Sequence, residues 1–321
     1  MDDLDTLYEA VRRGERRAAA RLISQIEAGE RAVAPLVRRL YQAGGATPMI
    51  GITGPPGAGK STLADRLVGL WRQQGHSVAV LAVDPSSPLT GGALLGDRVR
   101  MGRHNADRGV FIRSMASRGC LGGLAGAAGD ALIVLDAMGF GRILVETVGT
   151  GQNEIDILHH AGSVVIVQTP AGGDDVQAMK AGMLEIGDVF VVNKADLPGA
   201  DRAVAQLRDS VAFRHHMAGP ELWVPSVLKT QASDGSGVVA LDAALSAHIA
   251  HFKDFPQAWA RRQRLRAEGI LVERLREILR ERYRLGAAKP QRFACALDDV
   301  VARRADPYSA ALALLDEGGL A

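Results

Sequence analysis

The sequence lacks the features that mark several classes of protein. Lys and Arg number 38 against 36 Asp and Glu, so the formal net charge of +2 does not favour nucleic acid or an anionic membrane as a partner. The two cysteines, Cys120 and Cys295, lie far apart without CxxC or Cys/His spacing. This spacing argues against a disulfide framework and a structural zinc site, and we expect a reducing, cytoplasmic location.

Long hydrophobic runs and an export signal are also missing. The most apolar stretch, residues 120–140, is interrupted by Asp130 and Asp136. The chain starts with Asp2, Asp3 and Asp5, where a signal peptide would be basic and then apolar. We therefore expect neither membrane insertion nor export. A length of 321 residues with 47% hydrophobic composition is enough to bury at least one full α/β core.

Hydrophobic periodicity divides the chain into three parts. Residues 1–45 carry apolar side chains at helical spacing and predict a packed helical extension. Residues 255–321 predict a helical arm that opens with a long Arg-rich helix, about 257–285, whose basic residues are offset by acidic ones. Between them, over 46–254, helices alternate with strands, which predicts a mostly parallel sheet covered on both faces. The expected strands lie near 48–53, 77–83, 109–113, 142–148, 163–168, 188–193 and 223–228.

A phosphate-binding loop follows the first expected strand. Residues 54–61, GPPGAGKS, fit GxxxxGK[ST] between an apolar strand and a helix, which is the context that the motif requires. The backbone N–H groups of Gly57, Ala58 and Gly59 are expected to surround phosphate oxygens, and the helix N-terminus adds its positive dipole end. The sequence thus predicts a P-loop nucleotide hydrolase.

The side chains near this loop predict how phosphate and magnesium are held. Lys60 is expected to reach the β and γ oxygens, Ser61 to ligate magnesium and Thr62 to bond the α-phosphate. Asp84 ends the second strand and Asp97 follows on a Gly-rich loop, so both are candidate magnesium ligands, directly or through water. A helix cap or a turn residue is the alternative role for each aspartate.

The catalytic elements are less clearly marked. Gly149, after the strand 142–148, could offer its N–H to a γ-phosphate, but Thr150 stands where a water-orienting Gln would follow. Unaided hydrolysis is therefore expected to be slow. The acidic loop 172–175, which includes Asp174 and leads to Lys180, is a candidate for a movable element that supplies catalytic charge. The alternative is a surface loop with a solvated lysine.

A second motif predicts guanine as the base. Residues 193–196, Asn-Lys-Ala-Asp, end an apolar strand and match NKxD. The Asp196 carboxylate can accept from N1–H and the 2-amino group of guanine, which adenine cannot offer in that pattern. Lys194 can lie over the ring, and Asn193 can tie this loop to the phosphate loop. Gln231 and Ala232 stand where many G proteins have Ser-Ala contacting the guanine oxygen, a weak match.

With these motifs in place, the sequence resembles the MeaB/ArgK family of G-protein chaperones for adenosylcobalamin-dependent acyl-CoA mutases. The resemblance runs from about residue 45 to 245. It rests on five segments in the family's order: GITGPPGAGKST (51–62), VAVLAVDPSS (78–87), TGGALLGDRVRM (90–101), ILVETVGTGQNE (143–154) and VVNKADL (191–197).

The resemblance implies a GTPase that binds GTP, GDP and Mg²⁺ and gates the loading, protection or rescue of such a mutase. It implies that Asp84, Asp97 and Glu146 serve magnesium and the switch regions. It also implies that the loop 172–180, with Asp174 and Lys180, is a further switch that a bound mutase orders, and that the C-terminal arm joins a homodimer. The sequence departs from the family at Gln231, where Ser is more usual.

Three other functions remain open from the sequence. A nickel-insertion GTPase would need a His or Cys cluster that this sequence lacks, and a small-molecule kinase would have no need of NKAD. A nucleotide switch that never hydrolyses is compatible with the missing Gln. The pairs His159-His160 and His215-His216 are expected on helix surfaces rather than as metal ligands, and cobalamin is not placed on this chain because it has no DxHxxG pattern.

Overall fold

The computed structural model describes residues 3–45, 47–84, 101–104, 106–116, 123–147, 159–170, 181–215, 222–282 and 291–316. The chain separates into two compact units, Met1–Ile270 and Leu271–Ala321, and each unit is described by itself. The three-part division at residues 45 and 254 stays a prediction.

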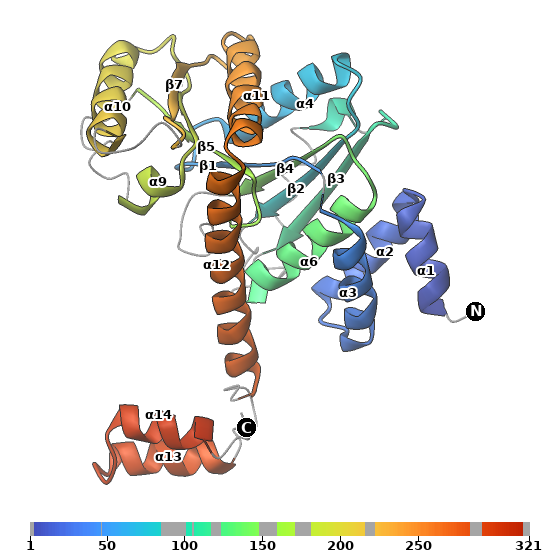
Figure 1. The fold of residues 1–321 in the computed structure, drawn as a ribbon, viewed down its shortest axis with the longest axis vertical. Helices are drawn as coiled ribbons and strands as arrows, with labels where there is room; N and C mark the ends of the chain where they lie inside the picture. The colour runs from blue at the N-terminus through green and yellow to red at the C-terminus, as the bar shows by residue number, and fades with distance from the viewer. Residues whose placement is uncertain are drawn as a thin grey trace. The chain divides into compact units, whose positions relative to one another are not determined.

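The first unit is built on a sheet of seven strands, in which every neighbouring pair is parallel (Figure 1). The spatial order is β3-β2-β4-β1-β5-β6-β7, so β1 lies between β4 and β5. A parallel α/β sheet is therefore confirmed. The strands are β1 (Met49–Thr53), β2 (Val78–Asp84), β3 (Val110–Ala116), β4 (Arg142–Thr147), β5 (Ser163–Gln168), β6 (Val189–Val192) and β7 (Ser226–Lys229).

Two strands differ by three residues from an expected bound, and the other five agree within one residue. β3 continues to Ala116, three residues further than expected; Arg113 interrupts its apolar pattern because its guanidinium pairs with Glu27 of a neighbouring helix. β7 begins at Ser226 rather than at 223. Trp223, the first residue of the expected strand, lies before β7 and donates from Nε1 to the carbonyl of Asp188 at 2.8 Å.

Helices cover both faces of the sheet. On one face α4 packs against β1, β2 and β4, and α11 packs against β5, β6 and β7. On the other face α6 covers β2, and α10 covers β6 and β7. Alternation along β2 serves both layers, because Val78 and Val80 enter the α4 core while Ala79 and Leu81 enter the α6 core. The helices after the first strand are α4 (Lys60–Gln73), η2 (Gly102–His104), α6 (Gly123–Ala137), α9 (Ala181–Ile186), α10 (Ala200–His215), α11 (Val238–Asp254) and α12 (Pro256–Arg282).

The N-terminal helices form a further layer outside α6. They are α1 (Asp3–Arg12), α2 (Arg16–Glu27), the short η1 (Arg31–Val33) and α3 (Ala34–Ala43). The residues expected to pack do so: Leu22, Ile23 and Leu40 are fully buried in the same core as α6. Figure 1 shows these helices beside α6. The role expected of this segment, packing, is confirmed.

A buried polar cluster holds the start of α12 against the amino-terminal ends of β5 and β6. Asp188, before β6, accepts from the N–H of Val164 at 2.8 Å and lies 3.2 Å from Nε2 of His248. The guanidinium of Arg262 reaches the same carboxylate at 2.5 Å, and His248 Nδ1 lies 2.8 Å from Ser163 Oγ. Burial raises the pKa of Asp188, but the contacts with His248 and Arg262 outweigh it and hold that pKa below its ordinary value.

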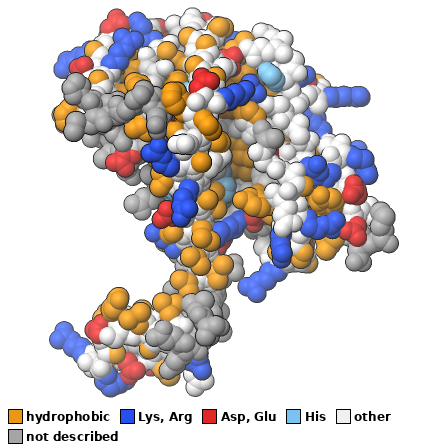
Figure 2. Space-filling view, viewed as in Figure 1, with side chains coloured by type: hydrophobic (Ala, Val, Ile, Leu, Met, Phe, Trp, Pro, Cys, Tyr) orange, Lys and Arg blue, Asp and Glu red, His pale blue; other side chains and the backbone are white. Residues whose placement is uncertain are grey.

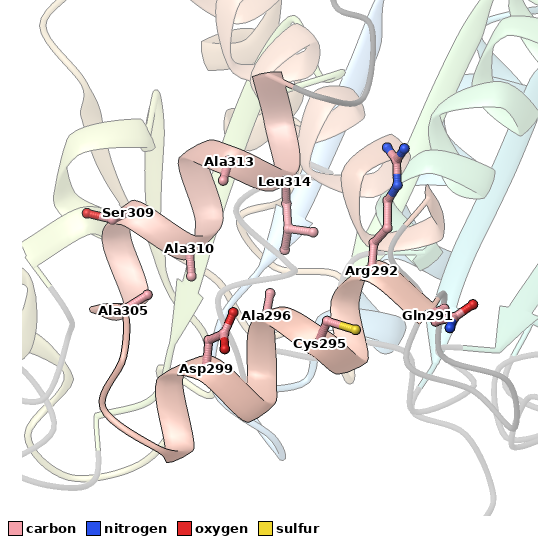
Figure 3. A pocket seen from close by; sticks show the side chains of 10 residues that line it. All are labelled: Gln291, Arg292, Cys295, Ala296, Asp299, Ala305, Ser309, Ala310, Ala313 and Leu314. Carbon is pink, nitrogen blue, oxygen red and sulfur yellow. The ribbon is translucent and has the colours of Figure 1, made fainter.

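The second unit contains the end of α12, then α13 (Gln291–Val301) and α14 (Pro307–Asp316), which pack against each other. Hydrophobic side chains gather over this helix pair (Figure 2). A groove between the two helices is lined by Cys295 and Ala296 from α13 and by Ala310 and Leu314 from α14 (Figure 3). Among the helices that the structure describes, none is long and apolar enough to span a membrane.

We predict that Asp188→Asn destabilises the protein by about 3 kcal/mol at pH 7, because it leaves the Arg262 charge without its counter-ion. A carboxylate with a lowered folded pKa stabilises the fold above its unfolded pKa of about 3.9, and this contribution disappears as the pH falls through the folded pKa. Denaturant unfolding of wild type and variant should show a constant gap from pH 5 to 8 that closes below about pH 4. Asp209→Asn, on the exposed face of α10, is the control and should leave stability unchanged. An equal gap at every pH would contradict the role of the carboxylate charge.

Candidate nucleotide site

The candidate site lies at the carboxyl ends of the central strands. The strands β4, β1, β5 and β6 lie side by side in that order and are parallel, so the residues that follow them meet at the carboxyl ends of the sheet. The phosphate loop follows β1, Glu146 and Thr147 end β4, Gln168 ends β5, and the NKAD segment follows β6. The order of motifs in the sequence is thereby converted into a cluster in space.

Glycines shape the phosphate loop at three positions. Gly54, Gly57 and Gly59 all have positive φ, at 145°, 77° and 88°. A Cβ on Gly54 would lie 1.9 Å from the carbonyl oxygen of Val167 in β5, and a Cβ on Gly59 would lie 2.4 Å from Nδ2 of Asn193. The loop can follow this path only because these residues have no side chain.

Two side chains at the start of α4 are directed into the site. Lys60 is buried, and its Nζ donates to the carbonyl oxygens of Gly54 at 2.7 Å and Pro55 at 3.0 Å, so the charge lies inside the loop. Ser61 donates from Oγ to Oε1 of Glu146 at 2.6 Å, and both residues are buried. A hydroxyl and a carboxylate in contact are oxygen donors of the kind that magnesium prefers.

Several polar side-chain atoms at the carboxyl ends of the neighbouring strands are buried and lack a partner in the part of the chain that the structure describes. Thr53 Oγ1, Thr147 Oγ1 and Gln168 Nε2 have no hydrogen-bond partner among the described residues. They end β1, β4 and β5, the strands that surround the phosphate loop. Because unpaired buried polar atoms cost about 1 to 3 kcal/mol each, their gathering at one edge fits a site that takes a polar ligand. The residues present therefore fit a nucleotide with its magnesium ion.

Asn193 joins three loops. Its Nδ2 donates to the carbonyl of Ala58 in the phosphate loop at 2.8 Å, which is the tie expected from the sequence. Its Oδ1 accepts from Thr230 Oγ1 and from the N–H of Ala232, both at 3.0 Å. A single buried amide thus fixes the phosphate loop and the segment after β7 to the end of β6.

The other predicted base-binding residues surround Asn193. Lys194 adopts φ of 57°, and Lys194 and Asp196 are both exposed at the sheet edge. The N–H of Gln231 donates to Ser236 at 3.0 Å, and that of Ala232 donates to Asn193. The contact of this segment with the guanine oxygen stays a prediction, as do the base-binding roles of Lys194 and Asp196. Thr62 is exposed on α4.

Five predicted site residues lie outside what the structure describes. Asp84 ends β2, but its side chain is outside the described part, and Asp97, Gly149, Asp174 and Lys180 fall in segments that are not described. Their roles stay predictions.

The helix position expected for His159 and His160 is wrong. These residues form the turn before β5 rather than a helix surface, and their carbonyl oxygens accept from Arg266 of α12 at 2.8 and 2.6 Å. Burial lowers the pKa of Arg266 to about 10, so the guanidinium remains charged near neutral pH. Their rings lie against Gly269 and Gly129. In the other pair, His215-His216, His215 is the last residue of α10. The structure does not describe its side chain, and it does not describe His216.

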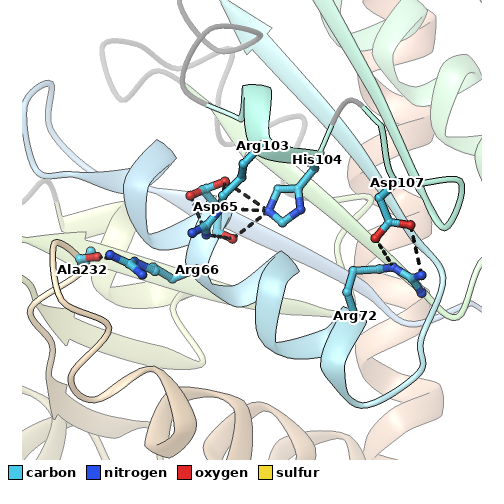
Figure 4. Close-up of polar contacts among 7 residues, drawn as sticks. All are labelled: Asp65, Arg66, Arg72, Arg103, His104, Asp107 and Ala232. Carbon is cyan, nitrogen blue, oxygen red and sulfur yellow. Dashed lines mark hydrogen bonds and ion pairs between the residues drawn. The ribbon is translucent and has the colours of Figure 1, made fainter.

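The structure also shows polar contacts around α4 that the sequence motifs did not identify (Figure 4). Arg66 donates to the carbonyl of Ala232 at 3.0 Å and to that of Ser233. The Asp65 carboxylate accepts a hydrogen bond from Nε of Arg103 at 2.9 Å and lies 3.1 Å from Nε2 of His104. These contacts hold η2 to α4, the helix that follows the phosphate loop. No motif marks these residues; only their helical spacing from Ser61 and Thr62 places them near the site.

We predict that Gly59→Ala weakens GDP binding by about a hundredfold, because the new methyl would displace Asn193 in addition to the strain of a left-handed alanine, about 1 to 2 kcal/mol. Gly75→Ala is the matched control, since Gly75 has φ of 87° and nothing within 4 Å of an added Cβ. Calorimetric titration with GDP should show control affinity within twofold of wild type. Equal affinity losses in the two variants would mean that backbone strain, and not Asn193, governs the effect.

Comparisons with known proteins agree with this geometry. A family model described as methylmalonyl-CoA mutase-associated GTPase MeaB matches residues 19–286. A protein of Pyrococcus horikoshii named as a putative GTPase is 43% identical over 99% of both chains. The GTPase ArgK of Escherichia coli K12 is 36% identical over 73% of both chains.

A mouse protein and a solved structure are also similar to this chain. The mouse mitochondrial methylmalonic aciduria type A homolog is 33% identical over 74% of this chain and 61% of its own length. A crystal structure of an LAO/AO transport system kinase superposes with a TM-score of 0.71 over 98% of both chains at 23% identity, which supports the fold alone. From the family match and these relatives, the chain belongs to the MeaB family of methylmalonyl-CoA mutase-associated GTPases.

Proposed function

We propose that this GTPase is a chaperone for an adenosylcobalamin-dependent acyl-CoA mutase, which gates cofactor loading and protects or reactivates the mutase. The observation that carries the proposal is the family match over residues 19–286, whose description names a methylmalonyl-CoA mutase. The printed name of the mouse relative, which refers to methylmalonic aciduria, supports the same class of client.

The chemistry of the phosphate site supports magnesium-dependent GTP hydrolysis. Lys60 exchanges its two carbonyl partners for phosphate oxygens when nucleotide binds, and its charge stabilises the negative charge that develops during transfer. Ser61 and Glu146 would hold a magnesium ion, which would neutralise charge on the phosphates, and Asp84 and Asp97 would contribute directly or through water.

The remaining catalytic residues complete the site only with help from a partner. Gly149 offers its N–H to the γ-phosphate, and the loop with Asp174 and Lys180 is a further switch on which a bound mutase acts. Because Thr150 follows Gly149, no side chain directly after it orients the attacking water, so turnover without a partner is slow. Asp196 reads the guanine edge, Lys194 covers the ring, and Gln231 and Ala232 lie at the guanine oxygen.

The second unit supports a homodimer joined by the C-terminal arm. Leu271, Leu275 and Ile278 of α12 are more than half exposed, at 61, 51 and 59%. On the helix pair, Val301 and Tyr308 are exposed at 76 and 73%. Apolar side chains so exposed in one unit favour burial against another protein surface, and a second copy of this arm is the partner that we propose.

The proposal predicts that GTP turnover with magnesium is slow for the protein alone and rises at least about tenfold with a client mutase, a lower bound well below the roughly 10³- to 10⁵-fold that a partner-supplied charge can give. ATP turnover should stay at background. The measurement is steady-state phosphate release with GTP or ATP, with and without purified methylmalonyl-, isobutyryl- and other acyl-CoA mutases.

Asp196→Asn is the matched variant, because it keeps the size of the side chain and removes the carboxylate. It should lose preference for GTP over ATP. A turnover indifferent to every mutase would overturn the chaperone role, and equal use of ATP by the wild type would favour a small-molecule kinase instead.

A further inference from the structure

Arg66 lies on the side of α4 that faces the segment after β7. Its Nε donates to the carbonyl oxygen of Ala232 at 3.0 Å (Figure 4). One terminal nitrogen donates to the next carbonyl, that of Ser233. The stem of Arg66 also lies beside the turn, because an added Cβ on Gly235 would be 4.0 Å from Arg66 Cδ. One side chain therefore holds two successive peptide groups.

The same segment is held from its other side by Asn193. The N–H of Ala232 donates to Asn193 Oδ1, while the carbonyl of Ala232 accepts from Arg66. Because the peptide group is planar and trans, a carbonyl fixed toward α4 directs the N–H of Ser233 away from that helix. The orientation of the backbone at 232–233 thus depends on both side chains.

Arg66 connects this segment to the helix that holds phosphate. It lies five residues after Ser61 on α4, so its guanidinium is attached to the rigid element that begins with Lys60 and Ser61. An arginine suits this position because its planar fork can donate to two carbonyls at once, whereas a lysine would donate from a single nitrogen.

We infer that Arg66 is a positioning residue for guanine recognition, which sets the backbone of residues 232–233 beside the NKAD segment. This inference rests on the proposed guanine site at Asn193 and Asp196. Arg66 acts through the backbone that it holds and leaves the phosphate chemistry at Lys60 and Ser61 intact.

The test compares wild type with Arg66→Ala and Arg66→Lys by calorimetric titration of GDP and ADP and by GTP turnover. Arg66→Ala should raise the Kd for GDP and the KM for GTP by about tenfold, because two charge-assisted hydrogen bonds are lost. The kcat at saturating GTP should stay within twofold, and the weak affinity for ADP should not fall. Arg66→Lys should be intermediate.

Arg72→Ala is the matched control. Arg72 is a second arginine of α4, but its guanidinium binds Asp107 at 2.8 Å and not the backbone of residues 232–233. Its loss should therefore leave GDP affinity unchanged. Thermal melting identifies a variant that fails to fold, in which case Arg66→Lys carries the test.

Wild-type GDP affinity in Arg66→Ala would overturn the inference, as would a parallel loss of GDP affinity, ADP affinity and kcat. Asp196→Asn, titrated alongside, distinguishes a failure of the Arg66 inference from a failure of the proposed guanine site. If Asp196→Asn loses guanine preference while Arg66→Ala binds GDP normally, the inference about Arg66 alone fails. If Asp196→Asn keeps that preference, the proposed guanine site fails, and the inference fails with it.

Discussion

The site depends on the amide of Asn193. This side chain is buried at the end of β6 and bonds at once to the phosphate loop through Ala58 and to the segment after β7 through Thr230 and Ala232. The close approach of Gly59 to Asn193 Nδ2 shows that the two loops leave no room for another side chain. The phosphate loop and the proposed base-binding segments are therefore parts of one hydrogen-bonded structure, so we expect a change in one loop to affect the other.

The sheet places this junction, and polar contacts hold the helices around it. The carboxyl ends of the neighbouring strands β4, β1, β5 and β6 bring Glu146, the phosphate loop, Gln168 and Asn193 to the same edge. At the amino-terminal ends of the strands, the ion pair between Asp188 and Arg262 attaches the start of α12 to the sheet. The unpaired polar atoms of Thr53 and Thr147, among the described residues, lie at the nucleotide edge, where a polar ligand would satisfy them.

Sequence reasoning predicted those parts of the structure that local patterns encode. The alternation of strands and helices predicted all seven strands, and the phosphate-loop and NKAD motifs predicted where Lys60, Ser61 and Asn193 lie. Contacts between distant segments carry no such pattern. Arg66 with Ala232, and Arg266 with His159, are side chain to backbone contacts across more than 100 residues, so residue type alone gave no sign of them. Trp223 shows the same limit, because it was expected to begin the last strand but lies before β7, where its indole donates to the carbonyl of the distant Asp188.

The central claim is that Asn193 unites phosphate binding and guanine recognition in one site. Calorimetric titration of GDP and ADP into wild type and Asn193→Ala tests it directly, with thermal melting to confirm that the variant is folded. The account predicts that Asn193→Ala weakens GDP binding by about a hundredfold, equivalent to about 2.8 kcal/mol, and loses the preference for GDP over ADP. A folded Asn193→Ala protein that binds GDP within twofold of wild type, with its guanine preference intact, would contradict it.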